Sequence, residues 1–86
     1  MDLKQLKSIL RQGESEAVEF KESFSDEVIE TLVAFANTTG GNIFLGVDNK
    51  GREKGLKLSD ENIQQWLNEI KSKTDFKIVP SVQIIK

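Results

Sequence analysis

Apolar residues recur along this chain at two spacings, and the two spacings alternate. Apolar positions three and four residues apart predict a helix from Lys4 to Gln12, another that begins after Ser25 and ends at Asn37, and another that begins after Ser59. Serine is a favoured N-cap residue, and acidic residues follow both serines, where the helix dipole favours negative charge. The pattern therefore predicts helices in these three places.

The stretches between and after these helices have the patterns of strands. Residues 17–21 alternate between apolar and polar, and residues 42–47 form a nearly continuous apolar run, which is typical of a central strand covered on both faces. Residues 48–51 have the composition of a turn, so residues 52–58 are expected to return as the second strand of a hairpin. The β-branched residues from Phe76 onwards predict a last strand.

The resulting order is helix, strand, helix, strand, strand, helix, strand. It predicts an α+β fold in which a mixed β-sheet of about four strands has about three helices packed on it. The length allows one domain, so residues 1–86 are expected to form a single unit. The apolar strand at 42–47 needs partners on both edges, and the last predicted strand ends with the chain. We therefore expect a truncated domain whose further strands follow Lys86.

The composition excludes several kinds of chemistry. The chain has no cysteine and no histidine, so disulfides, thiolate zinc sites, cysteine nucleophiles and histidine bases are ruled out. A metal site would have to use carboxylates. No apolar run is long enough to cross a bilayer, and the N-terminus lacks the pattern of a signal peptide. We therefore expect a cytoplasmic protein without a membrane partner.

Charge is distributed unevenly along the chain, although the net charge is only −2. Residues 1–48 carry four basic and nine acidic side chains, whereas residues 49–86 carry eight basic and five acidic ones. The densest basic cluster comprises Lys50, Arg52, Lys54 and Lys57. Basic residues at the tip of an exposed hairpin are candidate contacts for phosphate groups.

Three stretches, taken together, resemble the Schlafen AlbA-like domain. They are E-S-E-A-V-E-F-K-E-S at 14–23, L-V-A-F-A-N-T-T-G-G at 32–41, and N-I-F-L-G-V-D at 42–48, which Gly51 and Gly55 follow. The similarity runs in one uninterrupted order through most of the chain. Domains of this family are longer than this chain, which agrees with the truncation expected from the strands.

The resemblance implies a nucleic-acid-binding domain. Members of the family occur in bacterial transcriptional regulators, in helicase-like proteins and in animal Schlafens, some of which are RNA endonucleases. We therefore expect the N-terminal domain of a transcriptional regulator that binds DNA or structured RNA and needs no cofactor.

The nuclease members of this family use three carboxylates, which correspond here to Glu14, Glu19 and Asp48. Carboxylate oxygens suit Mg²⁺ or Mn²⁺, and such an ion can activate water and stabilise a phosphoryl-transfer transition state. The resemblance therefore implies, as an alternative, a metal-dependent endoribonuclease with these residues as metal ligands and catalytic groups. Carboxylates at strand ends are also common for solubility alone, so binding without cleavage is the preferred hypothesis.

For binding, the candidate contacts are the cations of the hairpin tip, together with one further basic residue and one asparagine. The set is Lys21, Asn37, Lys50, Arg52, Lys54 and Lys57. Asn37 also has a structural interpretation, because its side chain could hydrogen-bond the hairpin while Gly40 and Gly41 form a tight turn.

The aromatic residues bear on the kind of nucleic acid. Phe20, Phe35, Phe44 and Trp66 all fall at positions predicted to be core. No exposed aromatic platform for single strands is then expected, which favours duplex or structured nucleic acid.

Two further expectations concern protein partners. The slightly acidic balance favours, as another alternative, a protein-interaction domain. The last predicted strand, with residues 82–85 near its end, would present an open apolar edge, and such edges pair readily with a second copy. A homodimer with two-fold symmetry is therefore expected.

Overall fold

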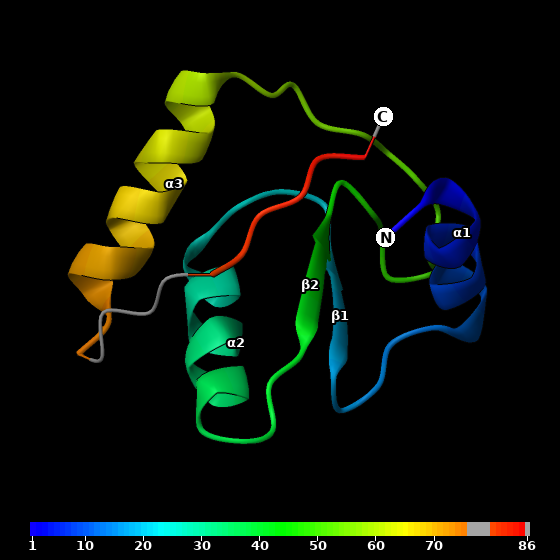
Figure 1. The fold of residues 1–86 in the computed structure, drawn as a ribbon, viewed down its shortest axis with the longest axis horizontal. Helices are drawn as coiled ribbons and strands as arrows, with labels where there is room; N and C mark the ends of the chain where they lie inside the picture. Colours follow the sequence, from blue (N-terminus) through cyan, green and yellow to red (C-terminus); the bar gives the residue numbers. More distant parts are fainter. Residues whose placement is uncertain (76–79, 86) are drawn as a thin grey trace.

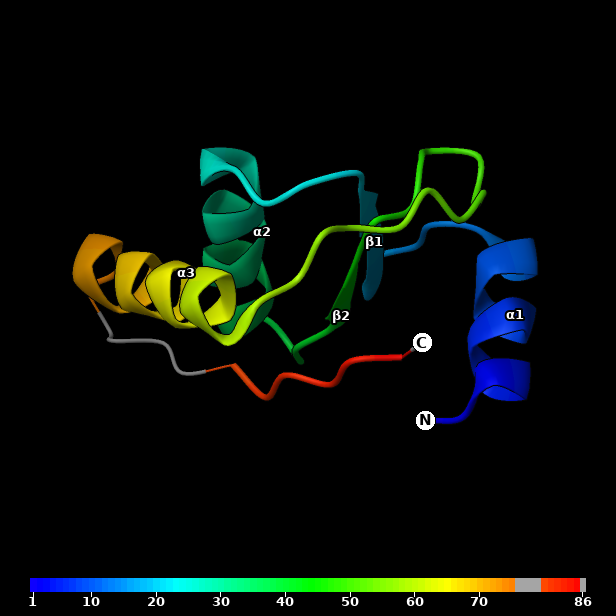
Figure 2. The ribbon, with the colours of Figure 1, turned by 90° about the horizontal axis from the view of Figure 1, so that it is seen from above.

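The computed structural model describes residues 1–75 and 80–85. Its elements follow the order α1 (Leu3–Gln12), β1 (Val18–Lys21), α2 (Asp26–Ala36), β2 (Asn42–Leu45) and α3 (Asp60–Lys73). α1 lies on one side of the small sheet, and α2 and α3 lie on the other side (Figure 1; Figure 2). The α+β class and the three predicted helices are confirmed.

β1 and β2 pair in parallel to form a two-stranded sheet, and α2 connects them. Phe20 lies beside Phe44 in this register, with ring centroids 6.2 Å apart in an edge-to-face arrangement. Side chains alternate across a strand, so Val18 and Phe20 share the face that packs against α1. Glu19 and Lys21 share the opposite face.

The main core lies between α1 and this sheet. Leu10, Phe20 and Val47 pack together, and each is at most 6% exposed. Leu6, one helical turn before Leu10, packs against this cluster together with Phe44. One apolar face of α1 therefore anchors the helix to the sheet.

Local capping explains where α1 begins and ends and where α3 begins. The Asp2 carboxylate accepts the Gln5 N–H at 2.8 Å, and the Gln5 side chain accepts the Asp2 N–H at 3.0 Å, which is a capping box. α1 ends at Gln12 and is followed by the C-cap Gly13, whose φ of 87° suits glycine. Ser59 caps α3 as predicted, and its hydroxyl accepts the Asn62 N–H at 3.0 Å.

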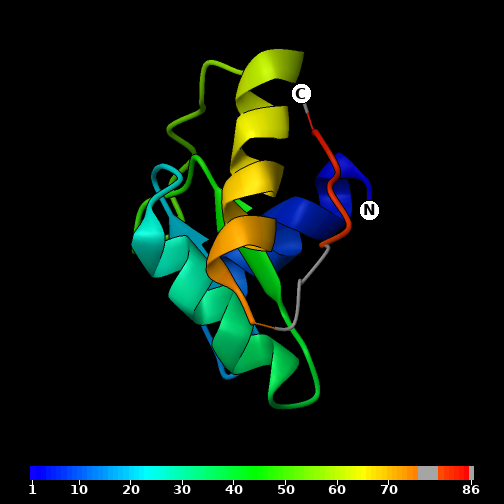
Figure 3. The same ribbon diagram turned by 90° about the vertical axis from the view of Figure 1, so that its left-hand side faces the viewer.

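α3 crosses α2 on the side of the sheet away from α1 (Figure 3). Trp66 of α3 stacks on Phe24 in the β1–α2 loop, with ring centroids 5.3 Å apart and ring planes 13° apart. At the end of α3, Lys73 Nζ lies 2.9 Å from Asp26 Oδ1. Trp66, which the apolar stripe predicts to be in the core, is half-buried in this stack.

The prediction of a mixed sheet of about four strands is wrong, because the described residues contain only two strands and these are parallel. β2 ends at Leu45, two residues earlier than predicted. The reason is Gly46, which adopts a φ of 86°. The N–H groups of Gly46 and Val47 then both donate to the Lys21 carbonyl, which interrupts the regular ladder.

The predicted return strand at 52–58 is reduced to one antiparallel bridge between Val47 and Glu53. After this bridge the Gly46 carbonyl accepts the Gly55 N–H at 2.9 Å, so the chain turns instead of extending the ladder. A Cβ at Gly46 would lie 3.2 Å from the Gly55 carbonyl carbon. The backbone at Gly46 and the backbone at Gly55 therefore lie in close contact.

The predicted C-terminal strand is absent from residues 80–85, and the rest of it, at 76–79 and 86, lies outside the described residues. Residues 80–85 run instead towards the start of α1, where the Gln83 side chain donates to the Met1 carbonyl at 2.9 Å. The strand edge that motivates the homodimer prediction is therefore not formed by residues 80–85.

Candidate nucleic-acid interface

A tight turn follows β2, and the side chain of Asp48 holds it together. Asp48 Oδ1 accepts the backbone N–H groups of Lys50 and Arg52, each at 2.9 Å. Asp48 Oδ2 accepts Arg52 Nε at 2.7 Å, and the Asp48 carbonyl accepts the Gly51 N–H at 3.0 Å. Aspartate has a short side chain, and its carboxylate often stabilises a turn by accepting hydrogen bonds from the backbone N–H groups that follow it. The conformation of residues 48–52 is therefore defined by a carboxylate that is itself buried.

The same hydrogen bonds lower the pKa of Asp48 to about 2, from an ordinary value of 3.8. The backbone N–H of Arg52 is the largest cause, and the Arg52 side chain and the Lys50 N–H add to it, while desolvation opposes them. Lys54 Nζ lies 4.0 Å from Asp48 Oδ2. Asp48 is thus ionised at neutral pH and pairs with the cations around it.

Gly51 brings this turn against the end of α1. Its φ is 81°, and a Cβ there would overlap the Leu10 carbonyl oxygen. The Phe20 ring lies 3.6 Å from the same point. Because only glycine tolerates both the conformation and the contact, Gly51 fixes the turn beside α1.

The basic side chains of the turn reach solvent. The Arg52 side chain is 64% exposed and the Lys54 side chain is 49% exposed, although both lie near Asp48. Lys50 is exposed as well, and Lys57 is exposed farther along the chain. These residues are accessible, and their contact with nucleic acid stays a prediction.

The other two predicted contacts have different surroundings. Lys21 Nζ lies 3.1 Å from Glu27 Oε2 and 3.5 Å from Glu19 Oε1, and the hydrogen bond with Glu27 is the main cause of its raised pKa. Asn37 is an exposed residue at the end of α2. It precedes β2 whereas the turn follows β2, so Asn37 and the turn lie at opposite ends of this strand.

The structure does not bring the three predicted metal ligands together. Glu14 Oε1 accepts the Phe20 N–H at 3.0 Å, and Glu19 pairs with Lys21. Both oxygens of Asp48 are occupied within its own turn. Among the residues that the structure describes, which include all three, no group of three acidic side chains could hold a metal ion.

α1 supplies basic residues that the sequence reasoning missed. Lys4, Lys7 and Arg11 are separated by three and four positions, so they share one side of the helix. Leu6 and Leu10 occupy the side that packs on the core. A basic row beside an apolar stripe at helical spacing is a signal that would have identified them.

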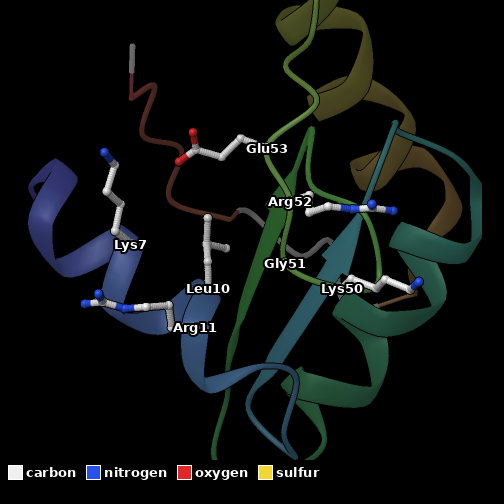
Figure 4. A pocket seen from close by; sticks show the side chains of 7 residues that line it. All are labelled: Lys7, Leu10, Arg11, Lys50, Gly51, Arg52 and Glu53. Atoms are coloured by element: carbon white, nitrogen blue, oxygen red, sulfur yellow. The ribbon is translucent and has the colours of Figure 1, made fainter.

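An open groove of about 530 Å³ lies between α1 and the turn, with their contact at Leu10 and Gly51 in its lining. The residues that line it are Lys7, Leu10, Arg11, Lys50, Gly51, Arg52 and Glu53 (Figure 4). Lys7 and Arg11 extend away from the turn, and Lys50 and Arg52 extend away from α1 (Figure 4). The groove therefore has a basic rim on each side, with Leu10 between the rims.

This arrangement suits an extended polyanion better than a small molecule. The groove is too open to solvent to enclose a small ligand. Its cations lie at the two rims and do not converge on one point (Figure 4). Phosphates spaced along a backbone match such a surface. As for membranes, none of the helices formed by residues 1–75 and 80–85 combines the length and the hydrophobicity that a transmembrane span requires.

Comparison with known proteins agrees with the sequence motifs in β1, in β2 and in the turn that follows it. The family model described as Schlafen, AlbA_2 matches residues 14–86, which includes both strands and the turn but not α1. None of the curated proteins and none of the solved structures gives a match. Because the matched region covers most of the sequence, the chain belongs to the Schlafen AlbA_2 family.

Proposed function

We propose that this domain binds duplex or structured nucleic acid through its phosphate backbone, with the turn after β2 as the main contact. The observation that carries the proposal is the turn itself, in which a buried carboxylate fixes the backbone while Lys50, Arg52 and Lys54 project into solvent. Preorganised cations lose little freedom when they meet phosphate. Membership of the Schlafen AlbA_2 family supports a nucleic-acid-related role.

Two variants of equal charge test this proposal. Lys50→Gln with Lys54→Gln removes two cations from the turn and leaves the Asp48–Arg52 pair intact. Lys71→Gln with Lys73→Gln is the matched control on α3, on the other side of the sheet from α1. Binding to labelled duplexes of about 20 base pairs, as DNA and as RNA, is measured by fluorescence anisotropy between about 50 and 200 mM NaCl.

The wild-type domain is expected to bind in a salt-dependent manner. The turn variant should bind more weakly, with a slope of log K against log salt that is lower by about 2, because about one unit is lost for each phosphate contact. The control should match the wild type. Equal binding by the turn variant and the wild type would show that the turn is not part of the interface. If the wild-type domain binds neither duplex, the proposed function is wrong.

Binding is proposed here as the activity, and cleavage stays a prediction. The endoribonuclease alternative requires Glu14, Glu19 and Asp48 to share an ion, whereas in this structure each of them accepts a hydrogen bond or pairs with a cation of the protein. Addition of Mg²⁺ or Mn²⁺ to the RNA probe tests cleavage directly. Product formation that Glu19→Gln abolishes would establish the nuclease.

We further propose that the domain acts within a transcriptional regulator and as a homodimer. The support for dimerisation is the exposure of two apolar side chains, Val82 and Ile84, which are 53% and 48% exposed. Two copies of the turn in one assembly would strengthen phosphate binding through avidity.

A further inference from the structure

We infer that α1 is a second phosphate-contacting element, so that one duplex spans the groove and contacts both α1 and the turn. This inference rests on the proposed function. It concerns residues that lie outside the region matched by the family, because α1 ends at Gln12 and the match begins at residue 14. α1 therefore lies outside the matched region, although Leu10 builds it into the core of this domain.

Charge on α1 supports the inference. The helix carries Lys4, Lys7 and Arg11 and no acidic residue, in a chain whose net charge is −2. Within residues 1–75 and 80–85, the ion pairs involve Lys21, Arg52, Lys54 and Lys73, and none involves these three cations. In the part of the chain that the structure describes, the cations of α1 are therefore not paired with carboxylates.

The spacing of this basic row matches a nucleic-acid strand. From Lys4 to Arg11 the helix rises about 10 Å. One strand of a duplex presents a phosphate about every 3.4 Å of axis, or about three over this length. Three cations along α1 thus face a similar number of phosphates.

The position of α1 favours nucleic acid over a lipid surface. A basic amphipathic helix binds a membrane by inserting its apolar face. In this structure that face is occupied at Leu6 and Leu10, which pack against the cluster that contains Phe20 and Val47, whereas Leu3 at the start of the helix is 45% exposed. The cationic side borders a groove whose other rim is also basic, so a polyanion lying across the groove meets cations on both sides.

Glu53 allows a test in which a substitution should strengthen nucleic-acid binding, whereas the loss of cations should weaken it. It lines the groove, and its carboxylate lies on the side of the turn that faces Lys7 (Figure 4). A negative charge between two basic rims repels phosphate. Removing this charge should strengthen binding if the duplex lies across the groove, and should have no effect if the duplex contacts only the far side of the turn.

The test uses the full chain, because removal of α1 would expose the core around Leu10. Lys7→Gln with Arg11→Gln is compared with Lys71→Gln and Lys73→Gln in the duplex assay, and thermal unfolding checks that each variant is folded. The α1 variant should lower the salt slope by about 2, and the α3 control should leave it unchanged. Glu53→Gln should bind more tightly at about 50 mM salt, with the difference shrinking as salt screens the charge.

The outcomes separate this inference from the proposed function. If the turn variant weakens binding and the α1 variant does not, α1 is not a contact and the proposed function stands. If the wild-type domain binds no duplex, both fail. Vesicles that contain phosphatidylserine form a third arm, and loss of vesicle binding in the α1 variant with unchanged duplex binding would assign the basic row to membranes and overturn the inference.

Discussion

Asp48 is buried at the start of the turn, and its carboxylate accepts three hydrogen bonds from the residues that follow it. The resemblance to nuclease members assigns this residue to a metal site, whereas the structure gives it a conformational role. An ion at this position would have to displace Arg52, whose Nε lies 2.7 Å from Asp48 Oδ2. The same contact limits how freely Arg52 can reorient towards a phosphate, so Asp48 acts as a positioning residue for the proposed interface.

Asp48→Asn is expected to lower the melting temperature at neutral pH, because its amide group would either face Arg52 Nε or replace the oxygen that accepts two N–H groups. The pKa of Asp48 is about 2 in the folded protein against an ordinary 3.8. A depressed carboxyl pKa contributes stability that is complete above the unfolded value and is lost as pH falls from about 4 to about 2. The difference in melting temperature between wild type and variant should therefore be full at pH 7 and shrink below about pH 4.

Circular dichroism melts across this pH range check the prediction. Asp75→Asn, at an exposed position, is the matched control and should leave the melting temperature at neutral pH unchanged. A difference for Asp48→Asn that stays constant down to pH 2 would contradict the role given to the ionised carboxylate.

At the scale of elements, the two sides of the sheet are held differently. α1 is anchored by a buried cluster around Leu10, whereas α3 meets the rest of the molecule through the half-buried Trp66–Phe24 stack, an exposed Lys73–Asp26 pair and the buried Ile70. Exposed ion pairs contribute little. The stack is therefore an important attachment of α3.

Phe24→Leu is expected to lower the free energy of unfolding by about 1 kcal/mol, the scale of one aromatic pair. The chain has a single tryptophan, so its fluorescence reports on the surroundings of Trp66 alone. We expect the emission of Trp66 to shift to longer wavelength while duplex binding is retained, because α1 and α3 lie on opposite sides of the sheet (Figure 2).

Phe35→Leu, in α2, is a suitable comparison because Phe35 is half-buried but makes no stack with Trp66. It should leave the emission wavelength unchanged. An unaltered spectrum in Phe24→Leu would show that the stack does not hold α3.

At the scale of the whole molecule, the proposed homodimer requires a surface through which two copies make contact. The homodimer prediction rests on a strand edge, and residues 80–85 form none. What this segment offers instead is exposed apolar surface at Val82 and Ile84, close to the N-terminus through the Gln83–Met1 hydrogen bond. A dimer formed there would use side-chain contacts and not backbone pairing.

Light scattering at micromolar concentration is expected to give the mass of a dimer for the wild type. Val82→Ser with Ile84→Ser should give the mass of a monomer, because burial of these two side chains is the proposed driving force. Leu58→Ser, at another exposed apolar position, should remain dimeric. A wild-type domain that is monomeric under these conditions would reject the dimer.

The sequence by itself determined the helices, because their signals are local. Apolar spacing, the Ser59 cap and the stop at Gly13 all act within a few residues, and each predicts its helix boundary closely. The positions of β1 and the core residue Phe20 followed from alternation in the same way. The family followed from motifs that lie in one uninterrupted order.

Only the tertiary structure decided the extent of the sheet and the surroundings of the site. Whether residues 52–58 form a strand depends on how closely the backbone at Gly46 approaches Gly55, a contact that no local pattern encodes. Whether the Asp48 carboxylate is available to a metal ion depended on whether its hydrogen-bond donors came from its own turn, and no local pattern states this. The basic row of α1 became part of a groove because packing at Leu10 and Gly51 brings two segments about 40 residues apart to the same place. Strand pairing and charge clusters arise from such distant contacts, whereas helices are specified by near neighbours.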